Sequence, residues 1–208
     1  NLLDGYPRFI IKICEYNPYM FRMQRVYKGK YPALDKKLIQ YLEEYLSFKT
    51  ADDDLSFQGQ VQCAEDIESW DNVFNSEPRY TTTGSAMQVS KSARVSKFAL
   101  KKADYKCEAD KCHTTFNTPK GVQYMEGHHL IPCTTSNAVA FYERFGVNID
   151  CPENIVCLCP TCHRKIHFGS DIEKKGIISQ LYLLRQDELK RIGVEISLDE
   201  LYRIYGLL

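Results

Sequence analysis

The histidines of this chain are the residues best suited to chemistry. All five lie between positions 113 and 167, and four of them form two close pairs, His128-His129 and His163-x3-His167. Imidazole is a ligand of zinc and of other borderline divalent metals. A core that only needs packing has no use for four clustered imidazoles, so the pattern predicts a histidine-lined site for a reactive metal ion.

Cysteine pairs accompany the histidines, as Cys107-x4-Cys112 and Cys159-x2-Cys162. Four thiolates in tetrahedral geometry close a structural zinc site, so the pairs predict two zinc knuckles that share one ion. Cys157 or His113 could replace one of these ligands. The nine cysteines are an odd number, and their spacing favours metal binding over a disulfide framework. We therefore expect a reducing, cytoplasmic location.

The local structure expected around the two histidine pairs gives them different roles. Pro160 can begin a helix, and His163 and His167 would then share one face as residues i and i+4. His128 and His129 follow a strand-like segment, and adjacent strand residues point in opposite directions. If His128 turns to the metal, His129 stays unligated and can accept a proton. Metal-assisted hydrolysis needs this combination of an ion and a separate base.

Two segments of this region resemble the HNH, or ββα-metal, endonucleases. The first is Glu126-Gly127-His128-His129-Leu130-Ile131-Pro132. The second is Pro152-Glu153-Asn154-Ile155-Val156-Cys157-Leu158-Cys159-Pro160-Thr161-Cys162-His163-Arg164-Lys165-Ile166-His167. They are most similar to restriction-type members with zinc knuckles, including nucleases that attack modified-cytosine DNA. The resemblance implies an α+β fold: a ββα-metal HNH nuclease module with a four-cysteine zinc site, a helical C-terminal tail and a separate N-terminal α+β region.

The resemblance also implies a role for each site residue. His129 would be the general base, Asn154 would be structural, and Glu126 would orient a histidine. The ligands of the catalytic ion would be His128, His163 and His167. An all-imidazole set of ligands suits Mn²⁺, Ni²⁺ or Zn²⁺ better than Mg²⁺, which prefers oxygen. The expected cofactors are thus one structural Zn²⁺ and one catalytic divalent ion.

The elements that position these residues fall into three parts. Residues 1–85 form an N-terminal region with an amphipathic helix over about 32–46, and DNA recognition or dimerisation would suit it. Residues 86–170 form the nuclease domain. Residues 171–208 form a C-terminal helical extension.

Besides the helix that begins at Pro160, four more are expected in the last two parts. One covers about 92–104 and leads to Cys107, and a shorter one covers about 138–145 in an insert beside the active site. In the tail, one helix covers about 177–192. The other opens with the capping box Ser197-Leu198-Asp199-Glu200, in which serine and glutamate satisfy free backbone amides.

The formal net charge is zero, but bases gather beside the metal module. Phosphate contacts are expected on the helix before Cys107 and on the metal helix, from Arg94, Lys97, Lys101, Lys102, Arg164 and Lys165. A solvated helix face is the alternative interpretation of such a charge run. No stretch reaches the roughly 18 apolar residues that span a bilayer, so no membrane partner is expected.

The leading hypothesis is a metal-dependent DNA endonuclease of restriction or antiphage defence. Cutting of both strands with one active site per chain would favour a homodimer. One alternative is a zinc-knuckle nucleic-acid-binding module without turnover, although binding alone would not need His129. Another is an RNA-cleaving or toxin-type HNH nuclease.

Overall fold

The computed structural model describes residues 55–65, 75–83 and 86–208. The chain divides into two compact units, Asn1–Phe48 and Lys49–Leu208, and every described residue belongs to the second. The amphipathic helix predicted over about 32–46 lies outside the described residues.

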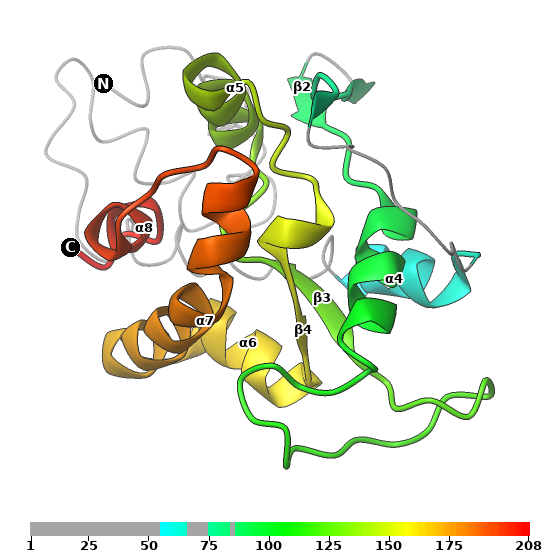
Figure 1. The fold of residues 1–208 in the computed structure, drawn as a ribbon. Coiled ribbons are helices and arrows are strands. Elements are labelled where there is room, and N and C mark those ends of the chain that lie inside the picture. The colour runs from blue at the N-terminus through cyan, green and yellow to red at the C-terminus, as the bar shows by residue number, and fades with distance from the viewer. Residues whose placement is uncertain (1–54, 66–74, 84–85) are drawn as a thin grey trace, which may run out of the picture. The chain divides into compact units, whose positions relative to one another are not determined.

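A two-stranded antiparallel sheet carries the histidine module (Figure 1). Strand β3 (Glu126–His129) pairs with β4 (Ile155–Leu158) in a register that sets His128 opposite Val156. Helix α6 (Pro160–Phe168) follows β4 at once and contacts both strands. The order strand, strand, helix confirms the ββα arrangement predicted from the sequence.

Helix α4 (Ala93–Lys102) packs on the same sheet. Its side chains Val95 and Ala99 form a small buried cluster with Ile155. The approach is close at Gly127, where an added Cβ would lie 3.2 Å from Cβ of Ser96. A larger residue at Gly127 would therefore push α4 away from the strand that carries the histidine pair.

The remaining elements surround this centre. Strands β1 (Tyr80–Thr83) and β2 (Ala86–Val89) pair antiparallel. Helix α5 (Thr135–Phe145) lies within the insert, and the 3-10 helix η2 (Pro152–Asn154) leads into β4. The tail forms α7 (Asp171–Arg191) and α8 (Leu198–Ile204). Both the insert helix and the two tail helices were predicted from the sequence.

Helix α7 begins at Asp171, well before the predicted start near residue 177. The reason is a capping box at Ser170 that the sequence-based prediction did not use. The Ser170 side chain accepts the Glu173 amide, and the Glu173 carboxylate accepts the Ser170 amide. At α8 only the serine half of the predicted capping box forms: the Ser197 hydroxyl accepts the Glu200 amide at 3.1 Å, while the Glu200 carboxylate pairs with Arg144.

An ion pair between buried Arg185 and partly buried Glu108 ties α7 to the first cysteine loop. Arg185, 5% exposed, places Nη2 2.7 Å from both carboxylate oxygens of Glu108. The same nitrogen donates to the Ile155 carbonyl at 3.1 Å. Glu108 in turn accepts the Cys157 amide at 2.7 Å, so this pair links α7, β4 and the loop that holds Cys107.

A helical segment at residues 55–63 lies along β3. The amide side chain of Gln58 donates to the Gly127 carbonyl at 2.8 Å and accepts the Gly127 amide at 3.0 Å. Gln62 donates to the Met125 carbonyl at 2.9 Å. These side chains satisfy backbone groups that a neighbouring strand would otherwise bind. Within the described ranges, no helix is long and apolar enough to cross a membrane.

Candidate active site and zinc site

Three histidines from β3 and α6 converge on one point. His128, His163 and His167 each offer a ring nitrogen within 4.8 Å of the others. Nε2 of His163 and Nε2 of His167 are 3.2 Å apart. The His128 ring centroid lies 4.9 Å from that of His163 and 5.2 Å from that of His167. The fold thus brings together the three residues that the sequence predicted as ligands of one ion.

Glu126 fixes the orientation of His163. Its Oε2 atom lies 2.7 Å from Nδ1 of His163, and both side chains are buried. Burial alone would raise the pKa of Glu126, but the interaction with His163 outweighs it and lowers this pKa. The carboxylate therefore accepts the Nδ1 hydrogen, and the lone pair on Nε2 of His163 points toward His167.

The donor set fits a borderline divalent ion. Burial, together with the neighbouring His163 and His167 rings, lowers the pKa of His128 well below its ordinary value. A neutral imidazole keeps a lone pair for a metal. Three imidazole nitrogens suit Mn²⁺, Ni²⁺ or Zn²⁺, and three protein ligands leave coordination positions open to water or a phosphate.

His129 points away from this trio and binds a carboxylate. Its Nε2 atom lies 2.8 Å from Oδ1 of Asp150, and each side chain is 7% exposed. The other oxygen of Asp150 accepts the Ser92 amide, also at 2.8 Å. With the Nε2 hydrogen given to Asp150, Nδ1 of His129 carries the lone pair that can accept a proton.

Asp150 was not predicted from the sequence. This residue ends the insert that was expected beside the active site, and no motif surrounds it. His129, Asp150 and Cys133 also form a buried group that could hold a metal. Burial, however, raises the pKa of the Cys133 thiol to about 12, and a thiol that keeps its proton is a poor ligand. The three-histidine group is the better metal site.

Asn154 binds the backbone just after His129 and just before Asp150. Its side chain is fully buried and donates to the carbonyls of Ile131 at 2.9 Å and Ile149 at 2.8 Å. Its oxygen accepts the Ile131 amide at 2.8 Å. The loop after β3 and the segment before β4 are thereby joined, which keeps His129 and Asp150 in contact.

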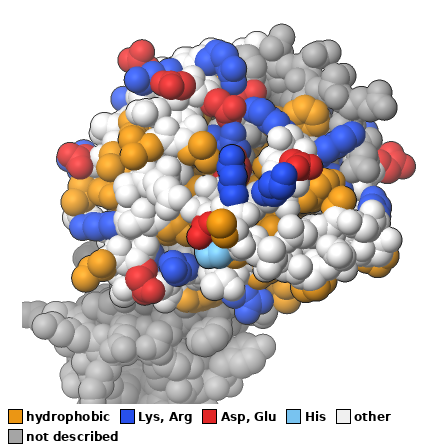
Figure 2. Space-filling model, turned by 60° about the horizontal axis from the view of Figure 1, so that its bottom comes forward, with side chains coloured by type: hydrophobic (Ala, Val, Ile, Leu, Met, Phe, Trp, Pro, Cys, Tyr) orange, Lys and Arg blue, Asp and Glu red, His pale blue; other side chains and the backbone are white. Residues whose placement is uncertain are grey.

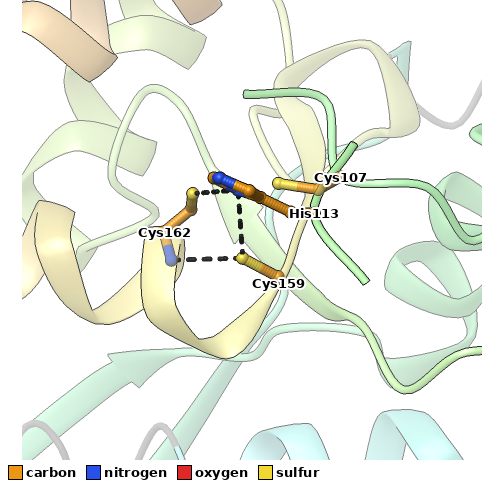
Figure 3. Close-up of side chains that lie close together, drawn as sticks. All are labelled: Cys107, His113, Cys159 and Cys162. Atoms are coloured by element: carbon orange, nitrogen blue, oxygen red, sulfur yellow. Dashed lines mark hydrogen bonds between the residues drawn. The ribbon is translucent and has the colours of Figure 1, made fainter. Parts of the chain in front are cut away.

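A second group contains sulfur ligands and lies at the N-terminus of α6 (Figure 3). It consists of Cys107, His113, Cys159 and Cys162, whose ligand atoms lie within 4.8 Å of one another. Nδ1 of His113 is 3.3 Å from Sγ of Cys162 and 3.7 Å from Sγ of Cys159. Three sulfurs and one imidazole are a common ligand set of structural zinc.

The ionisation of these thiols fits a bound cation. Burial alone would raise the pKa of Cys107, but hydrogen bonds from the amides of Cys159 and Asp110 outweigh it and lower this pKa. For Cys162, burial and the nearby Cys107 raise the pKa instead. Negative charges on neighbouring thiolates repel one another, and a bound divalent cation would remove this repulsion.

The structure places His113, rather than the expected Cys112, in this group. Cys112 is exposed, and its amide donates to Oδ1 of Asp110 at 2.9 Å. The His113 amide binds the Asp110 carbonyl at 3.0 Å. This turn presents the His113 ring to the cysteines, with Nε2 3.5 Å from the Asp110 carboxylate. From the sequence, His113 was expected only as a substitute ligand.

Comparison with known proteins agrees with this geometry. Residues 107–169 match the family model described as HNH endonuclease. These residues form an HNH module. The chain is also 32% identical over 77 residues to the Type IV methyl-directed restriction enzyme EcoKMcrA of Escherichia coli strain K12. The match covers 37% of this chain and 23% of that enzyme, so the chain spans about a quarter of its relative.

The predicted phosphate-binding residues of the HNH module differ in exposure. Arg94, Lys101 and Arg164 are exposed, and Lys165 is partly exposed. Lys102 pairs with Glu188 on α7 at 2.9 Å. Figure 2 shows Lys and Arg side chains interspersed with acidic and apolar ones, rather than one continuous basic surface.

Lys97 does not lie where a phosphate contact requires. It is 2% exposed, and its Nζ lies 5.4 Å from the centre of the Tyr105 ring. The sequence predicted that Lys97 contacts phosphate. In the fold its side chain packs against the protein, so we correct this expectation.

Proposed function

We propose that this chain is a metal-dependent DNA endonuclease that hydrolyses phosphodiester bonds in restriction or antiphage defence. One observation carries the proposal: three histidines converge while the fourth, His129, turns away and binds Asp150. A structural zinc site would need no such fourth histidine. Hydrolysis needs it, because water must lose a proton as it attacks phosphorus.

The residues of the chain would divide the reaction as follows. His129 accepts a proton from water through Nδ1, since its Nε2 is bound to Asp150. The carboxylate of Asp150 then stabilises the imidazolium that forms. A divalent ion on His128, His163 and His167 would polarise the scissile phosphate and stabilise the leaving oxygen. Glu126 and Asn154 keep these groups in place through the hydrogen bonds described above.

DNA is the proposed partner. The exposed Arg94, Lys101 and Arg164 and the partly exposed Lys165, on α4 and α6, would contact phosphates and make affinity fall with salt. The defence role follows from the partial similarity to a methyl-directed restriction enzyme. Cutting of both strands would favour two copies of the chain, since the described residues hold one such site.

The test is cleavage of methylated and unmethylated supercoiled plasmid with Mn²⁺, Ni²⁺, Zn²⁺ or Mg²⁺. We expect nicking or linearisation with at least one ion, and no cleavage by His129→Ala. That variant should still bind both metals, which distinguishes a lost base from a lost ion. His167→Ala is the matched variant, since it should lose the catalytic ion and keep the zinc.

Two results would overturn the proposal. The first is a His129→Ala variant that cuts at the wild-type rate. The second is a wild-type protein that binds plasmid but cleaves it with none of the ions, as a zinc-knuckle binding module would. Cleavage of RNA but not DNA in a parallel assay would assign the site to an RNA nuclease.

A further inference from the structure

We infer that Tyr205, at the end of α8, is a positioning residue that fixes the tautomer and orientation of His128, so the C-terminal helix completes the metal site. The inference rests on the proposed function, because it assigns His128 as a ligand. It concerns a contact between residues 77 positions apart.

The hydroxyl of Tyr205 makes two short contacts. It lies 3.0 Å from Nε2 of His128 and 2.9 Å from the carbonyl oxygen of Leu130. A carbonyl can only accept, so the single hydroxyl hydrogen goes to Leu130. The hydroxyl oxygen must then accept from His128, which requires that Nε2 of His128 carry the hydrogen.

This assignment decides which atom of His128 faces the ion. With hydrogen on Nε2, the lone pair of the neutral ring is on Nδ1. A metal-binding histidine commonly donates its other N–H to an outer partner, which fixes the ring and strengthens the ligand. At His163 this outer partner is Glu126, which accepts from Nδ1 at 2.7 Å. At His128 the outer partner is Tyr205, which accepts from Nε2 instead of Nδ1.

The position of α8 explains how the hydroxyl is held. Ser197 caps the helix, and Leu201 is fully buried against the core. Tyr205 itself is partly exposed, but its hydroxyl reaches inward to β3 and the loop that follows it. Loss of the hydroxyl would leave the Leu130 carbonyl and the Nε2 hydrogen of His128 without this partner. The ring could then adopt the other tautomer, whose Nδ1 hydrogen blocks the metal.

The test compares Tyr205→Phe with Tyr202→Phe. Tyr202 is a matched control on the same helix, since its hydroxyl donates to the Lys175 carbonyl at 3.2 Å rather than to a group of the histidine site. Binding of Co²⁺ and Mn²⁺ is measured by calorimetry on protein whose structural zinc is in place. We expect Tyr205→Phe to weaken binding by about 10- to 100-fold, and Tyr202→Phe to leave it unchanged. Equal affinity of the two variants would overturn the inference.

A second measurement needs no variant. Imidazole ¹⁵N spectra of the wild-type protein with Zn²⁺ in the histidine site report which nitrogen of His128 carries hydrogen. We expect hydrogen on Nε2 and the metal on Nδ1, and the reverse would refute the role of Tyr205. Neither measurement includes DNA. If the wild-type trio binds no ion, the proposed function fails; if it binds and Tyr205→Phe binds equally, only the present inference fails.

Discussion

Replacement of Asp150 by asparagine should disable His129 while preserving the packing around it. Asp150 accepts two hydrogen bonds, one from Nε2 of His129 and one from the Ser92 amide, both at 2.8 Å. An asparagine side chain has one accepting oxygen and one donating NH₂ group. The Ser92 amide can only donate, so the oxygen must face Ser92 and the NH₂ group must face His129. His129 then has to accept on Nε2, which moves its hydrogen to Nδ1.

The expected loss of rate follows from this exchange of tautomers. The nitrogen that should receive the proton from water now carries one already. A histidine base held in the wrong tautomer loses about ten-thousandfold in rate, which corresponds to about 5 kcal/mol of activation free energy. Folding should be little affected, because both hydrogen bonds can still form. The pair is also buried, so added salt should not restore activity.

The assay is single-turnover cleavage of supercoiled plasmid with enzyme in excess and saturating Mn²⁺. Asp171→Asn makes the same chemical change on the exposed first turn of α7 and serves as the control. In a His129→Ala background, Asp150→Asn should have almost no further effect, since the two residues act as a unit. An Asp150→Asn rate within about tenfold of wild type would refute the assignment of the accepting nitrogen, because the tautomer exchange predicts a far larger loss.

Three further predictions concern the zinc site, the core and the DNA surface. His113→Ala should lose the structural zinc and Cys112→Ser should keep it, as metal analysis of the purified proteins will show; the opposite result would make Cys112 the fourth ligand. Arg185→Met should lower the free energy of unfolding by about 1–3 kcal/mol in chemical denaturation, because it leaves the partly buried Glu108 without this partner. An unchanged denaturation midpoint would mean that the ion pair between Arg185 and Glu108 does not stabilise the fold. Lys101→Glu should weaken DNA binding for all sequences and reduce the slope of affinity against salt by at least about one; an unchanged slope would place the DNA elsewhere.

Local sequence rules were sufficient for the elements that hold the predicted ligands. Pro160 begins a helix, which sets His163 and His167 on one face four residues apart. The alternation of a strand sends His128 and His129 in different directions. These outcomes depend only on backbone geometry over a few residues, so neighbouring residues were enough to predict them. The roles of these residues in catalysis stay predictions.

Other features arise from segments that are distant in the chain. Asp150 reaches His129 because Asn154 joins the segment after His129 to the segment before Asp150. Lys97 is buried because its side of α4 packs against the protein, with Nζ near the Tyr105 ring, and the periodicity of a helix does not reveal such tertiary packing.

The sequence by itself determined the three clustered histidines, their spacing and the ββα elements that present them, because these depend on covalent spacing and backbone repeat, whereas the structure put His113 in the place expected for Cys112. Only the tertiary structure decided which partner each imidazole meets: Glu126 for His163, Asp150 for His129 and Tyr205 for His128. Hydrogen-bond partners decide the tautomer of a histidine, and a partner 21 or 77 residues away leaves no local pattern.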